Sequence, residues 1–97
     1  MSEMHGRVAL VTGSSRGIGA AVAGMLARTG AWVAVHGRDA EALEAVRRDI
    51  ETSGGRAIGV EGDVTDYRAI EAMRLRIEQE LGPVDILVAN SARRLAG

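Results

Sequence analysis

The residues of this chain best suited to chemistry lie in VTGSSRGIGAA (residues 11–21), where three glycines occur within seven positions. Gly13, Gly17 and Gly19 follow an apolar run and precede a segment with helical periodicity. The first amides of a helix have no partner within it and carry partial positive charge, so they attract an anion. Glycine also lets a phosphate approach the backbone closely. The spacing therefore favours a phosphate-binding turn, although three glycines can also form nothing more than a tight strand-to-helix connection.

Alternating strands and helices place this turn at one edge of a sheet. Short apolar runs predict strands over residues 7–12, 31–36, 57–62 and 85–89, with helical periodicity between them. This alternation is typical of a parallel sheet with right-handed crossovers. We therefore predict an α/β fold, a Rossmann-type doubly wound sheet with strand order 3-2-1-4, in one domain over residues 1–97. In such sheets the ligand binds at the carboxyl ends of the strands, where strands 1 and 4 flank the point of reversal.

The helix boundaries are also marked in the sequence. Asp39 can cap the second helix, and Thr65 or Asp66 the third. Gly30 and the Gly82–Pro83 pair are typical of helix ends. Helical spacing predicts that the first helix buries one stripe of apolar residues, namely Ile18, Ala21, Val22, Met25 and Leu26.

Composition excludes several classes of function. A net charge of -1 argues against a nucleic-acid partner, and the absence of cysteine excludes disulfides, thiolate catalysis and Cys-ligated metals. All 12 basic residues are arginines, so neither a P-loop lysine nor a Schiff base can form. The N-terminal segment MSEMHGR has no apolar signal core, and no apolar run is long enough to cross a membrane. We expect a cytoplasmic protein with no metal site and no membrane partner.

Three motifs together resemble the short-chain dehydrogenase/reductase family. TGSSRGIG (12–19) resembles its Thr-Gly-x-x-x-Gly-x-Gly signature, GDV (62–64) its Asp-Val pair, and DILVANSA (85–92) its Asp-[Ile/Val]-Leu-Val-Asn-Asn-Ala-Gly stretch. The motifs occur in the family's order, each at the expected strand, and cover nearly the whole chain. Two positions depart from the pattern: Ala89 replaces the first Asn, and Ala92 replaces the Gly, where it adds a methyl group close to the cofactor.

The resemblance implies roles for individual residues in cofactor binding. Gly13, Gly17 and Gly19 would hold the diphosphate, with Ser15 in the same turn and Ile18 contacting the cofactor through its backbone. Asp63 would accept a hydrogen bond from the adenine amino group, and Val64 would pack beside it. Asn90 would lie below the adenine-side ribose. From the residues alone, Asp63 is equally well explained as a turn or cap residue.

The residues after the second strand predict which dinucleotide binds. An acidic side chain about 20 residues after the glycine turn binds the ribose 2′-hydroxyl of NAD, whereas arginine accommodates the 2′-phosphate of NADP. The family's acid usually stands at the position of Gly37, where glycine leaves room, and Arg38 follows directly. Arg16 could approach from the glycine turn. We therefore predict NADP(H), the alternative being that both arginines are ordinary solvated charges.

The catalytic residues that the resemblance implies are a tyrosine, a lysine one helical turn later and a serine. The lone tyrosine of this chain, Tyr67, has Glu71 four residues on, and there is no lysine. We therefore assign no catalytic residue and expect the chain to be inactive alone, as the cofactor-binding part of a longer reductase. That parent would reduce carbonyl groups reversibly, with 3-oxoacyl thioesters as a substrate class common in the family. The alternative is a non-catalytic nucleotide-binding module or a truncated pseudo-enzyme.

Two further expectations concern surfaces and histidines. A sheet that ends at the fourth strand has an exposed edge, so the isolated chain is expected to self-associate or form a homo-oligomer. His36 is expected to be a strand-end residue near the adenine side rather than a proton shuttle, and His5 has no assigned role.

Overall fold

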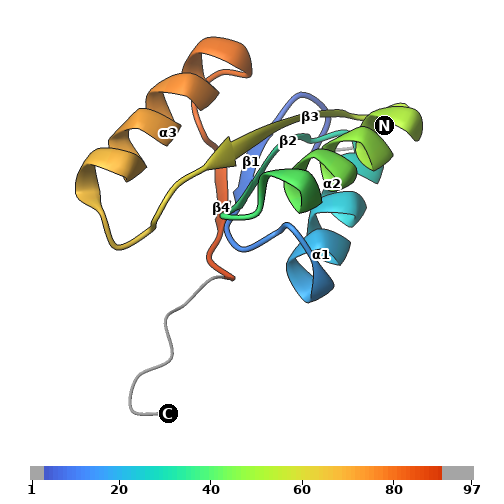
Figure 1. Ribbon diagram of the computed structural model, residues 1–97. Helices are drawn as coiled ribbons and strands as arrows, with labels where there is room; N and C mark the ends of the chain where they lie inside the picture. The colour runs from blue at the N-terminus through green and yellow to red at the C-terminus, as the bar shows by residue number, and fades with distance from the viewer. Residues whose placement is uncertain (1–3, 91–97) are drawn as a thin grey trace.

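Four parallel strands form a single sheet in the order β3-β2-β1-β4, as seen in the computed structural model, which describes residues 4–90 (Figure 1). The strands are β1 (Val8–Val11), β2 (Trp32–Gly37), β3 (Arg56–Glu61) and β4 (Ile86–Val88). β1 lies in register between β2 and β4. The predicted α/β fold and the predicted strand order are both confirmed.

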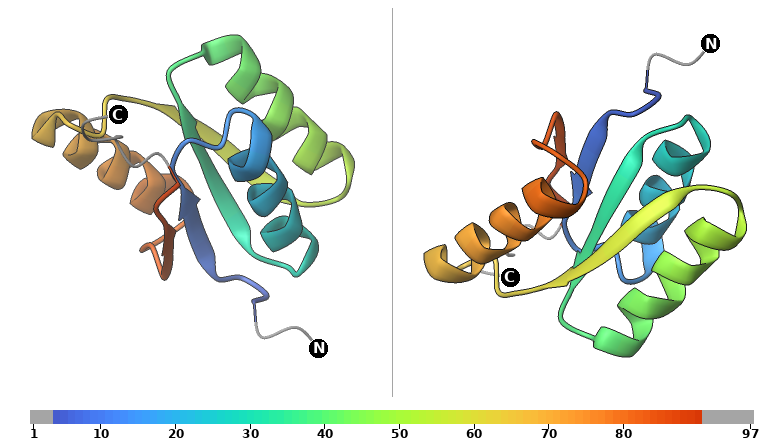
Figure 2. Two further views of the ribbon diagram at one scale, coloured as in Figure 1. Left: turned by 90° about the horizontal axis from the view of Figure 1, so that it is seen from below. Right: turned by 90° about the horizontal axis from the view of Figure 1, so that it is seen from above.

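Three helices cover the two faces of this sheet. α1 (Gly17–Arg28) and α2 (Ala40–Thr52) lie side by side on one face, and α3 (Tyr67–Glu80) lies on the other (Figure 2). Helices on both faces of a parallel sheet define a doubly wound fold. The carboxyl ends of β1, β2 and β3 therefore meet at one edge, and α1 and α2 both begin there.

The sheet separates two apolar cores. Val33 and Val35 of β2 pack with α1 and α2, whereas Ala34 belongs to the cluster that contains Ile77 of α3. This alternation follows from the two-residue period of a strand, which directs successive side chains to opposite faces. Each face is thus fixed by aliphatic packing, as the scarcity of aromatic residues requires.

The predicted buried stripe of α1 is partly wrong. Ile18 is 76% exposed and Met25 53% exposed, and Ala21 is exposed as well. The helix instead buries Gly19 and Ala23 against the sheet, with Val22 and Leu26 partly buried beside them. Small residues let the helix approach the sheet closely, and apolar periodicity alone cannot distinguish between two neighbouring stripes on the same helix.

The predicted helix boundaries agree with the structure. Asp39 caps α2, Asp66 caps α3, and Gly30 follows α1 with a φ of +100°.

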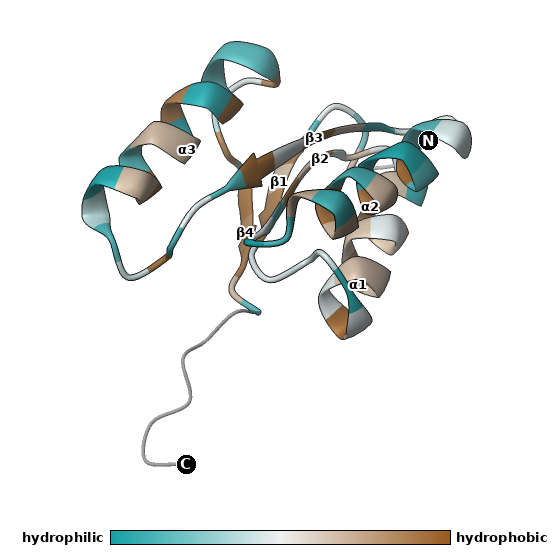
Figure 3. Cartoon of the chain, viewed as in Figure 1, coloured by the Kyte–Doolittle hydropathy of each residue, from teal (hydrophilic) through white to brown (hydrophobic). Residues whose placement is uncertain are grey.

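The outer surfaces of α2 and α3 are largely hydrophilic, while the strands are hydrophobic (Figure 3). No helix within residues 4–90 combines the length and the apolar character that crossing a membrane requires.

The fourth strand is an edge of the sheet in the described part of the chain, as expected. Leu87 in β4 is 63% exposed. Self-association through this edge stays a prediction.

Candidate functional site

The glycine turn between β1 and α1 requires glycine for two different reasons. Gly13 and Gly17 each have a φ of +62°, in the left-handed region that other residues rarely adopt. Gly19 is needed for space, because a Cβ atom there would lie 2.2 Å from the carbonyl oxygen of Gly13. The turn therefore folds back tightly over the first residues of α1 and brings the helix start to the carboxyl edge of the sheet.

The start of α1 differs from the starts of the other two helices. Asp39 accepts hydrogen bonds from two amides of α2, and Asp66 accepts one from α3. The corresponding residue of α1 is Arg16, whose side chain makes no capping hydrogen bond, and the first turn of this helix contains no acidic residue. A positive residue is the wrong charge for a helix N-terminus when only helix stability matters. The first amides of α1 are thus left open to an anionic partner.

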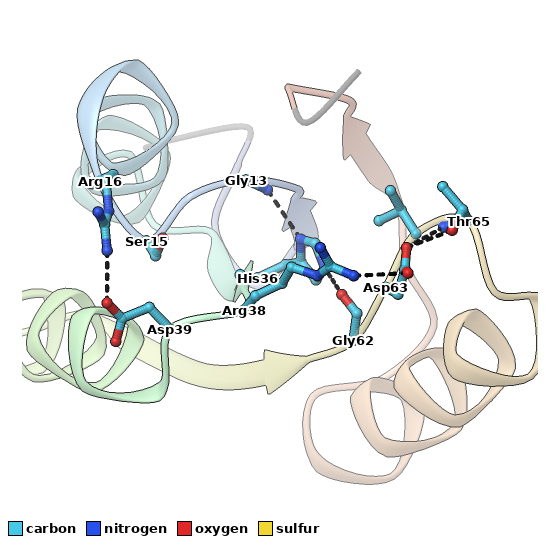
Figure 4. A pocket seen from close by; sticks show the side chains of 11 residues that line it. Gly13, Ser15, Arg16, His36, Arg38, Asp39, Gly62, Asp63 and Thr65 are labelled. Atoms are coloured by element: carbon cyan, nitrogen blue, oxygen red, sulfur yellow. Dashed lines mark hydrogen bonds and ion pairs between the residues drawn. The ribbon is translucent and has the colours of Figure 1, made fainter. Parts of the chain in front are cut away.

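A pocket of about 600 Å³ adjoins this helix start. It lies over the carboxyl ends of the first three strands and is lined from the glycine turn, from the end of β2 and from the end of β3 (Figure 4). Six of the ten residues predicted to bind cofactor line it: Gly13, Ser15, Arg16, Arg38, Asp63 and Val64. The other four, Gly17, Ile18, Gly19 and Asn90, are not among its lining residues, although Gly19 and Asn90 both adjoin Gly13.

Arg16 and Arg38, the two arginines predicted to bind the 2′-phosphate, both line the pocket, and each already has an aspartate partner. Arg16 Nη2 lies 2.7 Å from Asp39 Oδ2, and Arg38 Nη2 lies 2.8 Å from Asp63 Oδ2. The two pairs stand apart, one beside α1 and the other beside the end of β3 (Figure 4). A ligand phosphate would therefore compete with a carboxylate for each guanidinium. These are exposed pairs of the kind that contributes about 0–1 kcal/mol, so such an exchange costs little.

Asp39 serves two partners with its two oxygens. Oδ1 accepts from the amides of Glu41 and Ala42, and Oδ2 accepts from Arg16. The pKa of Asp39 lies below its ordinary value, chiefly because the Ala42 amide donates to the carboxylate, with the Arg16 guanidinium adding to the effect. The carboxylate is therefore ionised at neutral pH and holds Arg16 near the helix start.

Asp63 and Asn90 both have local structural roles. Asp63 Oδ1 accepts from the amide and the hydroxyl of Thr65, 2.8 Å and 2.7 Å away, which is the turn geometry foreseen as an alternative. The Asn90 amide Nδ2 donates to the carbonyl of Gly13 over 3.0 Å. Asn90 thus connects the end of β4 to the glycine turn.

Ser14 and His36 are two buried residues whose mutual hydrogen bonds the sequence did not reveal. Both are buried, at 0% and 3% exposure. The Ser14 amide donates to the His36 carbonyl over 2.7 Å, and the His36 amide donates to Ser14 Oγ over 2.8 Å. The expectation that His36 is a strand-end residue is correct, but its ring is part of the pocket wall. The sequence placed His36 near the adenine side, but no spacing rule predicts the hydrogen bonds of its ring.

Gly37 lines the pocket at the end of β2, and the expectation that this glycine leaves room for a ligand stays a prediction. A Cβ atom at Gly37 would lie 2.9 Å from both Cβ and Oγ of Ser15. The glycine turn fills the volume in which an acidic side chain would begin.

Comparison with known proteins agrees with this geometry. Residues 7–96 match the family model described as short chain dehydrogenase. The chain belongs to the short-chain dehydrogenase family. Among curated members, it is 49% identical over 86 residues to glycine betaine reductase ATRR of Emericella nidulans. It is 44% identical over 88 residues to gluconate 5-dehydrogenase of Gluconobacter oxydans.

Solved structures of the family share the fold. A metagenomic short-chain oxidoreductase in complex with NADP superposes with a TM-score of 0.82 at 43% identity, over 89% of this chain and 39% of that one. The alignments cover 89% of this chain and 7% of the betaine reductase, and 91% of this chain and 34% of the gluconate dehydrogenase. The chain therefore spans less than two fifths of the length of these family members.

The described residues place no tyrosine beside this pocket. Tyr67 is the first residue of α3, is 70% exposed and does not line the pocket. Among residues 4–90, no cluster of three histidine, aspartate or glutamate side chains is arranged to hold a metal ion. Ser91 and Ala92, the departure from the family's glycine, lie outside the described residues.

Proposed function

We propose that the pocket at the carboxyl edge of the sheet binds NADP(H), with the diphosphate at the start of α1. The observation that carries this proposal is the uncapped helix start, with Arg16 where the other helices have aspartate. An anion there would accept hydrogen bonds from the open amides and gain from the helix dipole. The turn glycines and the pocket of about 600 Å³ suit the group, and the family neighbour crystallised with NADP supports the same assignment.

The remaining predicted residues fit around that anchor. Arg38, with Arg16 from the turn, would receive the 2′-phosphate, because a guanidinium offers a planar fork of donors to phosphate oxygens. Asp63 would accept from the adenine amino group with Val64 beside it. Ser15 and Ile18 would contact the phosphates from the turn. Asn90 would act through the Gly13 carbonyl that it binds, next to the adenine-side ribose.

NADP(H) supplies or receives the hydride in reversible carbonyl reduction, and we propose this reaction class for the whole protein. This chain's contribution to that reaction is to bind and orient the dinucleotide. The family includes proteins named for gluconate and for glycine betaine, so the family alone does not select a substrate. A 3-oxoacyl thioester stays a prediction for the substrate.

Titration of the chain with NADPH and NADH, followed by nicotinamide fluorescence, tests the proposal. NADPH should bind at least about tenfold more tightly than NADH, since a hydrogen bond to a charged group contributes about 1.5–3 kcal/mol. Arg38→Gln should remove this preference by weakening NADPH and leaving NADH unchanged. Arg28→Gln, at the far end of α1, is the matched control and should change neither affinity. Equal affinity for both dinucleotides at moderate salt would contradict the assignment of the two arginines to the 2′-phosphate. If neither dinucleotide binds, the assignment of this pocket to a dinucleotide is wrong.

A further inference from the structure

His36 is the side chain that joins the glycine turn to the end of β3. Its Nδ1 atom lies 3.0 Å from the amide nitrogen of Gly13, and its Nε2 atom lies 2.8 Å from the carbonyl oxygen of Gly62. The ring is buried beneath the pocket and reaches between the two segments that line opposite sides of it (Figure 4). The imidazole therefore sets the distance between the candidate diphosphate turn and the candidate adenine side.

The partners of the two ring nitrogens determine the protonation state of His36. A backbone amide can only donate, so Nδ1 must accept from Gly13 and carries no proton. A carbonyl can only accept, so Nε2 carries the proton and donates to Gly62. The neutral ring satisfies both groups. A doubly protonated ring would direct an N–H at the N–H of Gly13, leaving that partly buried amide without its acceptor.

We propose that His36 is the positioning residue of the cofactor pocket, and that its neutral Nε2–H form holds Gly13 in the conformation that receives the diphosphate. This inference rests on the proposed function, since it concerns the same pocket. Gaining a proton would release Gly13 from the ring and weaken NADPH binding. Cofactor affinity should therefore be lower when the ring carries a second proton.

The charged groups around the ring do not reverse this expectation. Arg16 faces the pocket from the glycine turn, Arg38 and Asp39 from the segment after β2, and Asp63 from the segment after β3. Each arginine is paired with an aspartate, so the four charges sum to zero. A doubly protonated ring would keep its Nε2–H bond to Gly62 and would direct its Nδ1–H at the Gly13 amide, which cannot accept it.

Two substitutions separate the two hydrogen bonds. In His36→Asn, the side-chain oxygen takes the place of Nδ1, so the acceptor for Gly13 is retained without a titrating group. In His36→Gln, the side-chain nitrogen takes the place of Nε2, so the Gly62 contact is retained and the Gly13 acceptor is lost. NADPH affinity of each variant and of the unaltered chain is measured between about pH 5.5 and about pH 7.5. His5→Asn, at the chain's other histidine, is the control.

For the unaltered chain and the His5 control, we expect NADPH affinity to fall on acidification, because a protonated ring releases Gly13. His36→Asn should bind nearly as well at the upper pH and lose most of the fall, retaining only the part due to the ligand's own phosphate, which titrates near about pH 6. His36→Gln should bind at least about tenfold more weakly at every pH. A fall that is unchanged in His36→Asn, or an affinity that rises on acidification, would overturn the proposal.

An NMR measurement on the unaltered chain without ligand tests the proposal even if the His36 variants fail to fold. Long-range proton–nitrogen NMR of the unaltered chain should show His36 as the Nε2–H tautomer, and acidification should shift the Gly13 amide together with the ring. An Nδ1–H tautomer would refute the positioning role even if NADPH binds. Failure of the unaltered chain to bind NADPH, with the Nε2–H tautomer present, would instead count against the proposed function.

Discussion

Gly37→Asp introduces the acidic residue that favours NAD, but we expect it not to produce NAD binding. The reason is that the new side chain would collide with Ser15. A Cβ atom at Gly37 would lie 2.9 Å from Cβ of Ser15 and 2.9 Å from its Oγ. Rotation could move the hydroxyl, but Cβ of Ser15 moves only with the backbone of the glycine turn. Overpacking of this kind costs about 1–3 kcal/mol. Gly37→Asp alone is thus expected to lower the free energy of unfolding by that amount and to weaken both dinucleotides.

Removing the Ser15 side chain should remove the clash. The next nearest atom to a Cβ at Gly37 is Cγ of Leu43 at 3.6 Å, which is an ordinary contact. In a Ser15→Gly background, Gly37→Asp should therefore cost little through packing, and the carboxylate can reach the ribose. The expected coupling free energy between the two positions is about 1–3 kcal/mol.

Urea denaturation of the four chains of this double-mutant cycle gives the coupling, and titration with NADH and NADPH gives the specificity. Gly37→Ala in both backgrounds is the control that introduces Cβ without charge, and it should show the same coupling. If Gly37→Asp destabilises the chain equally with and without the Ser15 side chain, the steric explanation is wrong. If the double variant does not gain affinity for NADH relative to NADPH, the assignment of this position to the ribose is wrong.

Two other predictions concern α1. Gly19→Ala should destabilise the chain by about 3 kcal/mol, because its Cβ atom would overlap the carbonyl oxygen of Gly13. Gly24→Ala on the same helix should stabilise the chain by about 0.5–1 kcal/mol, because the nearest atom to its Cβ lies 3.6 Å away. Urea denaturation of both variants measures these effects. Equal effects at the two glycines would show that the helix does not approach the turn so closely. Arg16→Ser supplies a capping side chain and should raise stability by up to about 1 kcal/mol while weakening NADPH about tenfold. A loss of stability, or unchanged NADPH affinity, would contradict the assignment of this helix start to an anion.

Much of the fold was predictable because the sequence contains strong local signals. The strand order follows from the alternation of four apolar runs with helical segments. Asp39 caps the second helix as predicted, and Asp66, one of the two predicted candidates, caps the third. The stripe of α1 was harder, because α1 has apolar residues on more than one face. Which stripe is buried depends on the close approach at Gly19, a tertiary contact that periodicity does not encode.

The candidate site was predictable in its location and less so in its internal contacts. Parallel strands bring their carboxyl ends together, so the glycine turn, Arg38 and Asp63 were expected near one another, and all three line one pocket. The Arg38–Asp63 pair and the contacts of His36 depend on side-chain directions across three strands. Residues 23 or more positions apart make these bonds, and a spacing rule within one segment cannot anticipate them.

The departures from local stability rules in this chain concentrate at one edge of the sheet. α2 and α3 begin with the aspartate caps that favour a helix, but α1 begins with an exposed arginine. Beside it, the buried His36 at the end of β2 connects two loops through its ring. Neither choice improves the packing of the sheet, yet both leave or hold backbone amides in a defined position at the same pocket. Selection for stability alone would have removed them, so their coincidence supports ligand binding at this edge more strongly than the glycine spacing does by itself.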